Sequence, residues 1–126
     1  MTRTYIAFAI ILTIFSSLFI VLGIYQKQNN EILDSVDAMI ITFNDGDFAS
    51  SLEKAEDASR LWYNHSGFFK VVARHENLNA INSSLTRTIE YIIAKDKTLF
   101  AAESAVLSDL LMGLYENEQF TFSNIF

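Results

Sequence analysis

The sequence predicts an all-α protein, in which one N-terminal transmembrane helix precedes a small antiparallel bundle of about four helices with a short packed C-terminal tail. Three observations predict this class. No charged side chain occurs from Thr4 to Tyr25. Beyond that run, apolar residues recur every three or four positions, which is the spacing of one helix face. Proline is absent and only four glycines occur, a composition that favours long helices with few turns over a β-rich chain.

The uncharged run predicts a membrane span. A helix rises about 1.5 Å per residue, so Thr4 to Tyr25 reach roughly 33 Å, enough to cross a hydrocarbon layer of about 30 Å. We therefore expect residues 1–27 to form a transmembrane signal anchor and residues 28–126 to form an extracytoplasmic helical domain. The alternative is a cleaved signal peptide, although such peptides carry a shorter apolar region of about 7–15 residues. Only the weak Val21-Leu22-Gly23 resembles a cleavage site.

Charge predicts the orientation of the span and excludes one class of partner. Arg3 precedes the span, whereas Lys27 and then several acids follow it. The positive-inside rule favours a cytoplasmic N-terminus and a domain outside the cell membrane, by a margin of one charge. From Glu31 onward, fifteen acids face seven bases. Such a domain is repelled by nucleic acid and by anionic headgroups, so we expect lipid contact through residues 4–25 only and no nucleic-acid partner.

The first bundle helix continues from the span. No proline separates the two segments, so they can form one helix. Its expected core face is Ile32, Leu33, Val36, Ile40 and Phe43. The residues Asn44 to Asp47 then predict a turn, with Gly46 in a left-handed conformation and Asp47 capping the next helix.

Three further helices follow by the same spacing. The second starts near Phe48 and ends in Arg74 to Asn77, and Asn77 or Asn79 caps the third. The charged residues Lys95 to Lys97 mark the turn to the fourth helix, which ends around Glu116 to Glu118. The expected core faces are Phe48, Leu52, Ala55, Ala58, Trp62, His65, Phe69 and Val72 in the second helix, Leu78, Ile81, Leu85, Ile89 and Ile92 in the third, and Leu99, Ala102, Val106, Leu110 and Leu114 in the fourth.

The tail from Phe120 to Phe126 alternates aromatic and polar residues. Exposed phenylalanines would promote aggregation, so we expect the tail to pack back onto the helices. Its closing residues Asn124, Ile125 and Phe126 carry a second interpretation, as a carboxylate-bearing peptide for a groove on a partner.

The sequence contains no pattern of residues typical of a catalytic, metal-binding or phosphate-binding site. The absence of cysteine excludes a disulfide, a thiolate zinc site and a nucleophilic thiol. His65 and His75 would lie about 15 Å apart along one helix, too far to share an ion. The serines lack a nucleophile elbow, and the isolated glycines cannot form a phosphate loop. We therefore expect no catalytic residue, no metal, no cofactor and no enzyme activity. Trp62, the only tryptophan, is interpreted as a core anchor rather than a ligand-stacking platform.

Several short motifs resemble one family. They are Gly46-Asp47-Phe48, Ala55, Trp62, the run His75-Glu76-Asn77-Leu78-Asn79-Ala80-Ile81, Tyr91-Ile92, Lys95-Asp96, Glu116-Asn117-Glu118, Phe122 and Asn124-Ile125-Phe126. With these motifs, nearly the whole chain resembles the bacterial family known as domain of unknown function 4363, short proteins with one N-terminal span and a helical domain. The resemblance implies a cell-membrane location and no established activity.

Within that pattern, His75, Leu78 and Asn79 fall at the expected break between the second and third helices. Asparagine stands at position 79 where the family has aspartate about as often. A helix cap and a binding site are both left open for this stretch.

Two functions from different classes follow. The leading hypothesis is a protein-interaction or scaffold module at the cell membrane, with a membrane or surface protein as partner. Homo-oligomerisation is left open. The alternative is an extracytoplasmic small-molecule binding or sensor domain, because helical bundles can hold ligands between their helices. The residues expected to orient such a ligand are Tyr63, Asn64, His65 and Tyr91.

Overall fold

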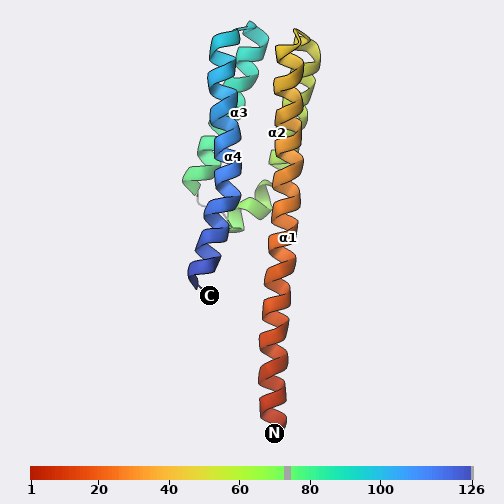
Figure 1. Cartoon of the computed structure of the whole chain (residues 1–126), viewed down its shortest axis with the longest axis vertical. Helices are drawn as coiled ribbons and strands as arrows, with labels where there is room; N and C mark the ends of the chain where they lie inside the picture. Colours follow the sequence, from red (N-terminus) through yellow and green to blue (C-terminus); the bar gives the residue numbers. More distant parts are fainter. Residues whose placement is uncertain (73–74, 126) are drawn as a thin grey trace.

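The computed structural model describes the backbone of residues 1–72 and 75–125. It describes the side chains of that part except those of Ser66, Phe68 to Val72, His75 and residues 115–125. Four helices make up the described chain: α1 (Thr2–Asn44), α2 (Phe48–Val72), α3 (His75–Ala94) and α4 (Lys97–Ile125). They run alternately up and down (Figure 1), and each packs against its neighbour in sequence while α4 packs against α1. The predicted all-α antiparallel bundle is confirmed.

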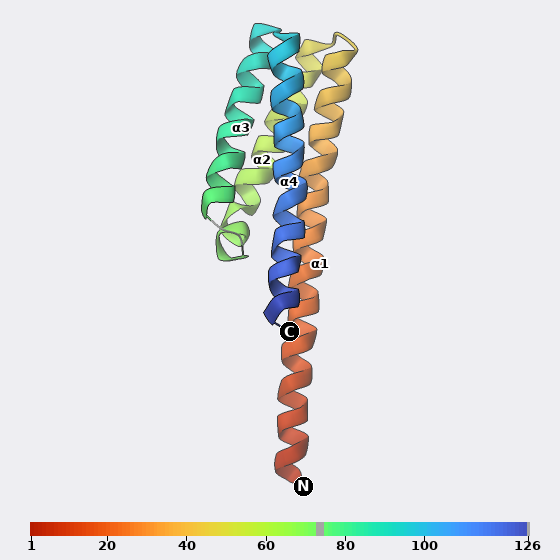
Figure 2. The ribbon, with the colours of Figure 1, turned by 60° about the vertical axis from the view of Figure 1, so that its left-hand side comes forward.

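The first helix, α1, is continuous and belongs to two parts of the molecule. Its C-terminal half packs in the bundle, whereas its N-terminal half projects beyond the other helices (Figure 2). The projecting half is apolar and open, and Tyr5 and Phe19 are each 73% exposed. Among the described residues, α1 is the one helix long and apolar enough to cross a membrane. The continuity expected from the lack of proline is therefore confirmed.

The core follows the predicted faces of the first three helices. Ile32, Val36 and Phe43 of α1 are buried as expected, and Met39 joins them. Buried positions in α2 and α3 also match the predicted spacing. The buried apolar residues of the core are Tyr25, Ile32, Val36, Met39, Phe43, Ala55, Ala58, Trp62, Leu78, Ile81, Leu85, Ile92, Phe100, Leu107, Leu111 and Leu114. Leu33, Ile40, Leu52 and Ile89 pack half-buried at the edges of this core.

Tyr25 marks the end of the packed core nearest the projecting half of α1, ahead of the boundary expected at residue 28. Its side chain is 2% exposed. Its hydroxyl donates a hydrogen bond to the carbonyl oxygen of Leu114 in α4 at 3.2 Å. The contact joins α1 to α4 and satisfies a polar group that burial would otherwise penalise. We call this end of the bundle the Tyr25 end.

Two capped turns close the opposite end of the bundle (Figure 1). Between α1 and α2, Gly46 has φ +84°, and a carboxylate oxygen of Asp47 accepts a hydrogen bond from the backbone N–H of Ser50 at 3.1 Å. Both features were predicted. Between α3 and α4, Lys95 adopts φ +56°, and Asp96 accepts a bond from the N–H of Leu99 at 3.0 Å.

Two predicted helix boundaries are wrong. Because α2 ends at Val72 and α3 begins at His75, Asn77 and Asn79 lie inside α3 and do not cap it. The fourth helix does not end at Glu116 to Glu118 but continues to Ile125. The expected separate tail is therefore the last part of α4. Its side chains, and Phe126 altogether, lie outside the described residues.

The predicted core face of α4 is also wrong. Phe100, Leu107 and Leu111 are buried, whereas Leu99 is 46% and Val106 is 45% exposed. Neighbouring residues point about 100° apart around a helix, so the two faces differ by one position in the chain. Phe100 determines the outcome, because its ring stacks on Phe43 with centroids 3.7 Å apart. Of the predicted face, Leu114 alone is buried.

Candidate interaction surface on α4

The displaced face of α4 forms an exposed apolar surface. Leu99, Ala102, Val106, Leu110 and Gly113 are spaced by three or four positions and lie on one side of the helix. We call these five residues the α4 stripe. Leu99, Ala102 and Val106 are exposed, and Leu110 and Gly113 are half-buried. The α4 helix is therefore apolar on two sides, one buried in the bundle and the other partly open to solvent.

The α4 stripe ends in a groove between α3 and α4. The groove holds about 260 Å³ and is lined by Asn77, Val106, Asp109, Leu110, Gly113 and Leu114. Its walls are mostly apolar, with Asn77 on one side and Asp109 on the other as polar groups. The volume is below the roughly 300–1,000 Å³ of typical ligand pockets. The groove is therefore better suited to one or two side chains of a docked protein than to an enclosed ligand.

An ion pair fixes α3 beside the α4 stripe. Arg87 of α3 donates from Nη2 and Nε to Oε1 of Glu103 at 2.9 and 3.0 Å. Burial alone would raise the pKa of Glu103, but hydrogen bonding, first of all to Arg87, and the charge of Arg87 together outweigh burial and lower that pKa. The hydrogen bond from its guanidinium to Glu103 likewise raises the pKa of Arg87. Glu103 is therefore ionised and paired with Arg87, and Asp109 is a second carboxylate beside the stripe.

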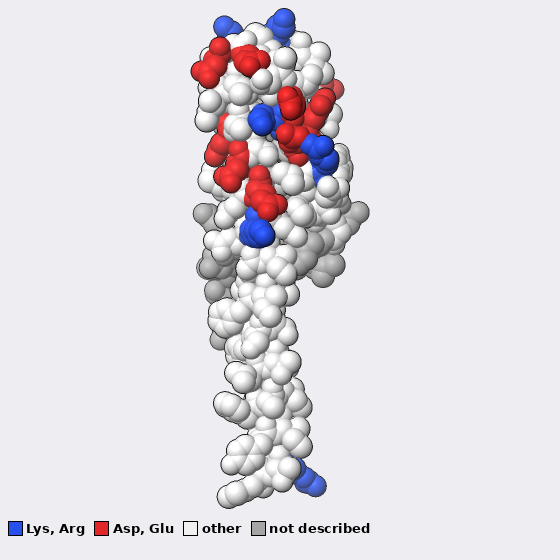
Figure 3. Space-filling model, turned by 90° about the vertical axis from the view of Figure 1, so that its right-hand side faces the viewer, with Lys and Arg blue, Asp and Glu red and all other residues white. Residues whose placement is uncertain are grey.

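The side of the bundle formed by α1 and α2 carries many more charged groups than the α4 stripe. Between Glu31 and Asp57, the chain has eight acids and one lysine. Figure 3 views this side, where the charged groups gather on the upper part over α1 and α2. The lower part of the same view is almost uncharged, because it is the projecting half of α1. The molecule therefore has one side on which acids outnumber bases, an apolar stalk and an uncharged stripe on α4.

Several polar side chains lie toward the Tyr25 end of the bundle. Nε2 of His65 is 3.8 Å from Oε2 of Glu31. The indole N–H of Trp62 donates to Oδ1 of Asn82, so α2 is tied to α3. Asn29 is 3% exposed, and its side-chain oxygen accepts no hydrogen bond from the described part of the chain. A buried acceptor of this kind is costly to leave unsatisfied.

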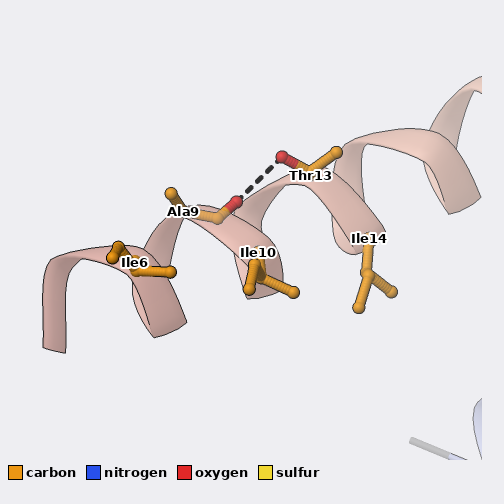
Figure 4. Close-up of a pocket in the computed structure, with 5 residues that line it drawn as sticks. All are labelled: Ile6, Ala9, Ile10, Thr13 and Ile14. Atoms are coloured by element: carbon orange, nitrogen blue, oxygen red, sulfur yellow. Dashed lines mark hydrogen bonds between the residues drawn. The ribbon is translucent and has the colours of Figure 1, made fainter. Parts of the chain in front are cut away.

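The projecting half of α1 has a shallow groove of its own (Figure 4). It is lined by Ile6, Ala9, Ile10, Thr13 and Ile14. The Thr13 hydroxyl donates to the carbonyl oxygen of Ala9 at 2.8 Å, and the Ser17 hydroxyl donates to that of Thr13 at 2.8 Å. Hydroxyls that bond within their own helix are compatible with apolar surroundings.

Among the residues singled out from the sequence, those with described side chains do not come together in one site. Trp62 and Leu78 are 1% and 5% exposed and belong to the core, whereas Asn79 lies on the surface of α3. The side chains of His75, Asn124 and Ile125, and all of Phe126, lie outside the described residues.

Within the part of the chain that the structure describes, no group of three or more His, Asp or Glu residues could hold a metal ion. The α4 stripe was missed, although the alternation of two apolar faces in this segment was a signal for it.

The fold and these surfaces define a class of protein, a four-helix antiparallel bundle carried on a long apolar helix. The sequence model of one family, described as Domain of unknown function (DUF4363), matches residues 19–125, so the chain belongs to this family. The match covers the whole bundle and begins inside the apolar half of α1. No curated protein and no solved structure is detectably similar to the chain.

Proposed function

We propose that the chain is a single-pass membrane protein whose extracytoplasmic bundle acts as a protein-interaction module, with the α4 stripe as its contact surface. The observation that carries the proposal is where exposed apolar side chains lie. On the projecting half of α1 they cover all sides of the helix, and on α4 they form one stripe beside a groove.

The projecting half of α1 supports an anchor. Large apolar side chains such as Phe8 and Ile20, 67% and 63% exposed, would be expensive to leave in water. The same helix continues into the core at Tyr25 and Ile32, so removal of the apolar half would cut inside a packed helix. This continuity favours an uncleaved anchor over a cleaved signal peptide.

The orientation rests on charge. Arg3 lies before the apolar segment, and Glu31, Asp34 and Asp37 lie after it. The positive-inside rule then favours a cytoplasmic N-terminus and a bundle outside the cell membrane.

Protease added to intact cells or right-side-out vesicles is expected to digest the bundle and spare the N-terminus. Protection of the bundle until the membrane is opened would contradict this orientation.

The α4 stripe supports the interaction role. Exposed apolar patches rimmed by polar groups are typical of protein contacts. Here Leu99 and Val106 are each close to half exposed.

A photo-reactive residue at Val106 in the full-length membrane protein is expected to crosslink to protein. The matched control at Glu53, on the acidic side of α2, is expected to give little product. Equal products from both positions would remove the α4 stripe as the contact surface.

Small-molecule binding is the second candidate, and one observation favours it. The groove at Asn77 and Asp109 has two polar groups against apolar walls. A metabolite that binds there should raise the melting temperature of the full-length protein in detergent, and Asn77→Ala should abolish the increase. A flat response across a broad set of metabolites would weigh against this candidate.

A further inference from the structure

We infer that the occupant of the α4 stripe is a second copy of this chain, lying parallel to the first and related to it by a two-fold axis along the long axis of the molecule. The inference rests on the proposed function, because it names the partner of the same surface. The argument has three parts, namely charge, direction and the size of the side chains.

Charge disfavours self-association through the acidic side of the bundle and permits it through α4. Two copies that met through α1 and α2 would bring together the acids of the segment from Glu31 to Asp57, where one lysine is the only base. Like charges brought together oppose association. None of the five residues of the α4 stripe is charged. Of the two carboxylates beside the stripe, Glu103 is paired with Arg87, and Asp109 lines the groove. Contact through α4 also keeps the two acidic sides apart.

Direction favours a parallel pair. The α4 stripe follows the axis of α4, which lies along the same direction as α1 (Figures 1 and 2). A two-fold axis along that direction leaves the projecting halves of both α1 helices on the same side. Two anchors in one bilayer require this arrangement, whereas an antiparallel pair of α4 helices would point the anchors in opposite directions.

Side-chain size permits a close approach of the helices. Ala102 lies between Leu99 and Val106, and Gly113 follows Leu110 along the stripe. Small side chains among larger ones let ridges of one helix enter grooves of the next, at interaxial distances of about 8–10 Å. In a two-fold pair each residue near the axis meets its own copy. The same geometry brings the two Asp109 carboxylates near each other, three residues after Val106, and their repulsion limits the affinity.

Disulfide crosslinking tests the pair directly, because the chain has no cysteine. Leu99→Cys and Val106→Cys are introduced one at a time into the full-length protein in its membrane, and oxidant is added. Both variants are expected to give a product of twice the chain mass. The control is Glu53→Cys on the acidic side, which is expected to stay monomeric.

The outcomes separate the possible partners. Crosslinking at neither stripe position, or crosslinking at Glu53→Cys as strong as at the stripe, overturns the pair. An antiparallel pair would place at most one of the two stripe positions near its own copy, so a product from one variant alone also overturns the parallel arrangement. If Val106 crosslinks only to a different protein, the proposed interaction role is supported, but the inference that the partner is a second copy of this chain is wrong.

Two charge variants give an independent measurement in detergent or nanodiscs. Val106→Arg places a cation on the stripe and should abolish the dimer, with an unchanged helical circular dichroism spectrum because Val106 is 45% exposed. Ile41→Arg, at a 62% exposed apolar residue of α1, is the matched control and should leave the dimer intact. Asp109→Asn should tighten the dimer by roughly two- to fivefold. A weaker dimer in Asp109→Asn would contradict the parallel register.

Discussion

Tyr25 shows how one residue joins parts that are far apart in sequence. Its ring belongs to the core and its hydroxyl bonds to the Leu114 carbonyl, so the α1 helix and the α4 helix are fixed to each other where the projecting half begins. The Ser51 hydroxyl does the same between helices near the turns, where it donates to the carbonyl oxygen of Met39 at 2.9 Å. Such contacts between helices set the register of a bundle whose apolar faces alone would permit sliding.

Removal of the Tyr25 hydroxyl should weaken the bundle modestly. Tyr25→Phe keeps the ring but leaves the Leu114 carbonyl without this donor, which should cost about 0.5–1.5 kcal/mol in the free energy of unfolding. Denaturant unfolding of the full-length protein in detergent measures the loss. Tyr5→Phe, at a 73% exposed tyrosine, is the control and should change the free energy little. An equal loss in both variants would remove the hydrogen bond as the cause.

The Arg87–Glu103 pair should make stability depend on pH. The pKa of Glu103 is lower in the folded chain than in the unfolded chain, despite the opposing effect of burial. The stabilisation is therefore complete above the unfolded pKa and is lost as pH falls through the lowered folded pKa, below about pH 4. Glu103→Gln should flatten this acid limb of the stability curve. Glu56→Gln, on the exposed side of α2, should leave it in place.

At the residue scale, features that depend only on neighbouring residues in the chain were predictable. Gly46 and Asp47 were expected in a left-handed turn and a cap, because a few neighbouring residues determine both features. Trp62 was expected in the core because its size favours burial on an apolar face. The Tyr25–Leu114 contact could not be predicted, since it joins residues 89 positions apart and depends on the packing of two helices.

At the scale of elements, the periodic pattern identified all four helices and the faces of three. It failed for α4 because that helix has two apolar faces. Leu99, Val106 and Leu110 form a regular series, and Phe100, Leu107 and Leu111 form another one position later. Periodicity alone cannot rank two such series. The stacking of Phe100 on Phe43 decides between them, and it appears only when α1 and α4 are brought together.

The end of α4 was missed for a related reason. The alternating residues from Phe120 to Ser123 resemble an extended tail, yet the segment contains neither proline nor glycine to stop a helix. A helix that has already formed propagates at little cost through such residues. The chain therefore continues as α4 to Ile125.

The position of Tyr25 predicts where a stable fragment must begin. A fragment of residues 24–126 keeps Tyr25, whereas a fragment of residues 28–126 removes a buried aromatic side chain from the core. The shorter fragment should be less stable by roughly 3–5 kcal/mol, the usual loss for truncating a large core aromatic residue. Urea unfolding of the two fragments measures the difference. Equal midpoints would show that Tyr25 contributes little to the core.

At the scale of the whole molecule, the distribution of apolar surface separates stalk from bundle. The fragment of residues 24–126 should remain in solution in plain buffer, because it lacks the exposed side chains that precede residue 24. The full chain should stay with membranes through alkaline carbonate washing and require detergent. Release of the full chain by carbonate would contradict an anchor that spans the bilayer.

The uninterrupted α1 rod has a mechanical consequence. A flexible linker would let the bundle swivel freely, but a helix shared by stalk and core transmits torque and axial displacement. If the stalk rotates or shifts by one turn, Tyr25 and Ile32 must move with it, and the register against Leu114 must break or the entire bundle must follow. The projecting half of α1 therefore determines both the position and the rotation of the bundle.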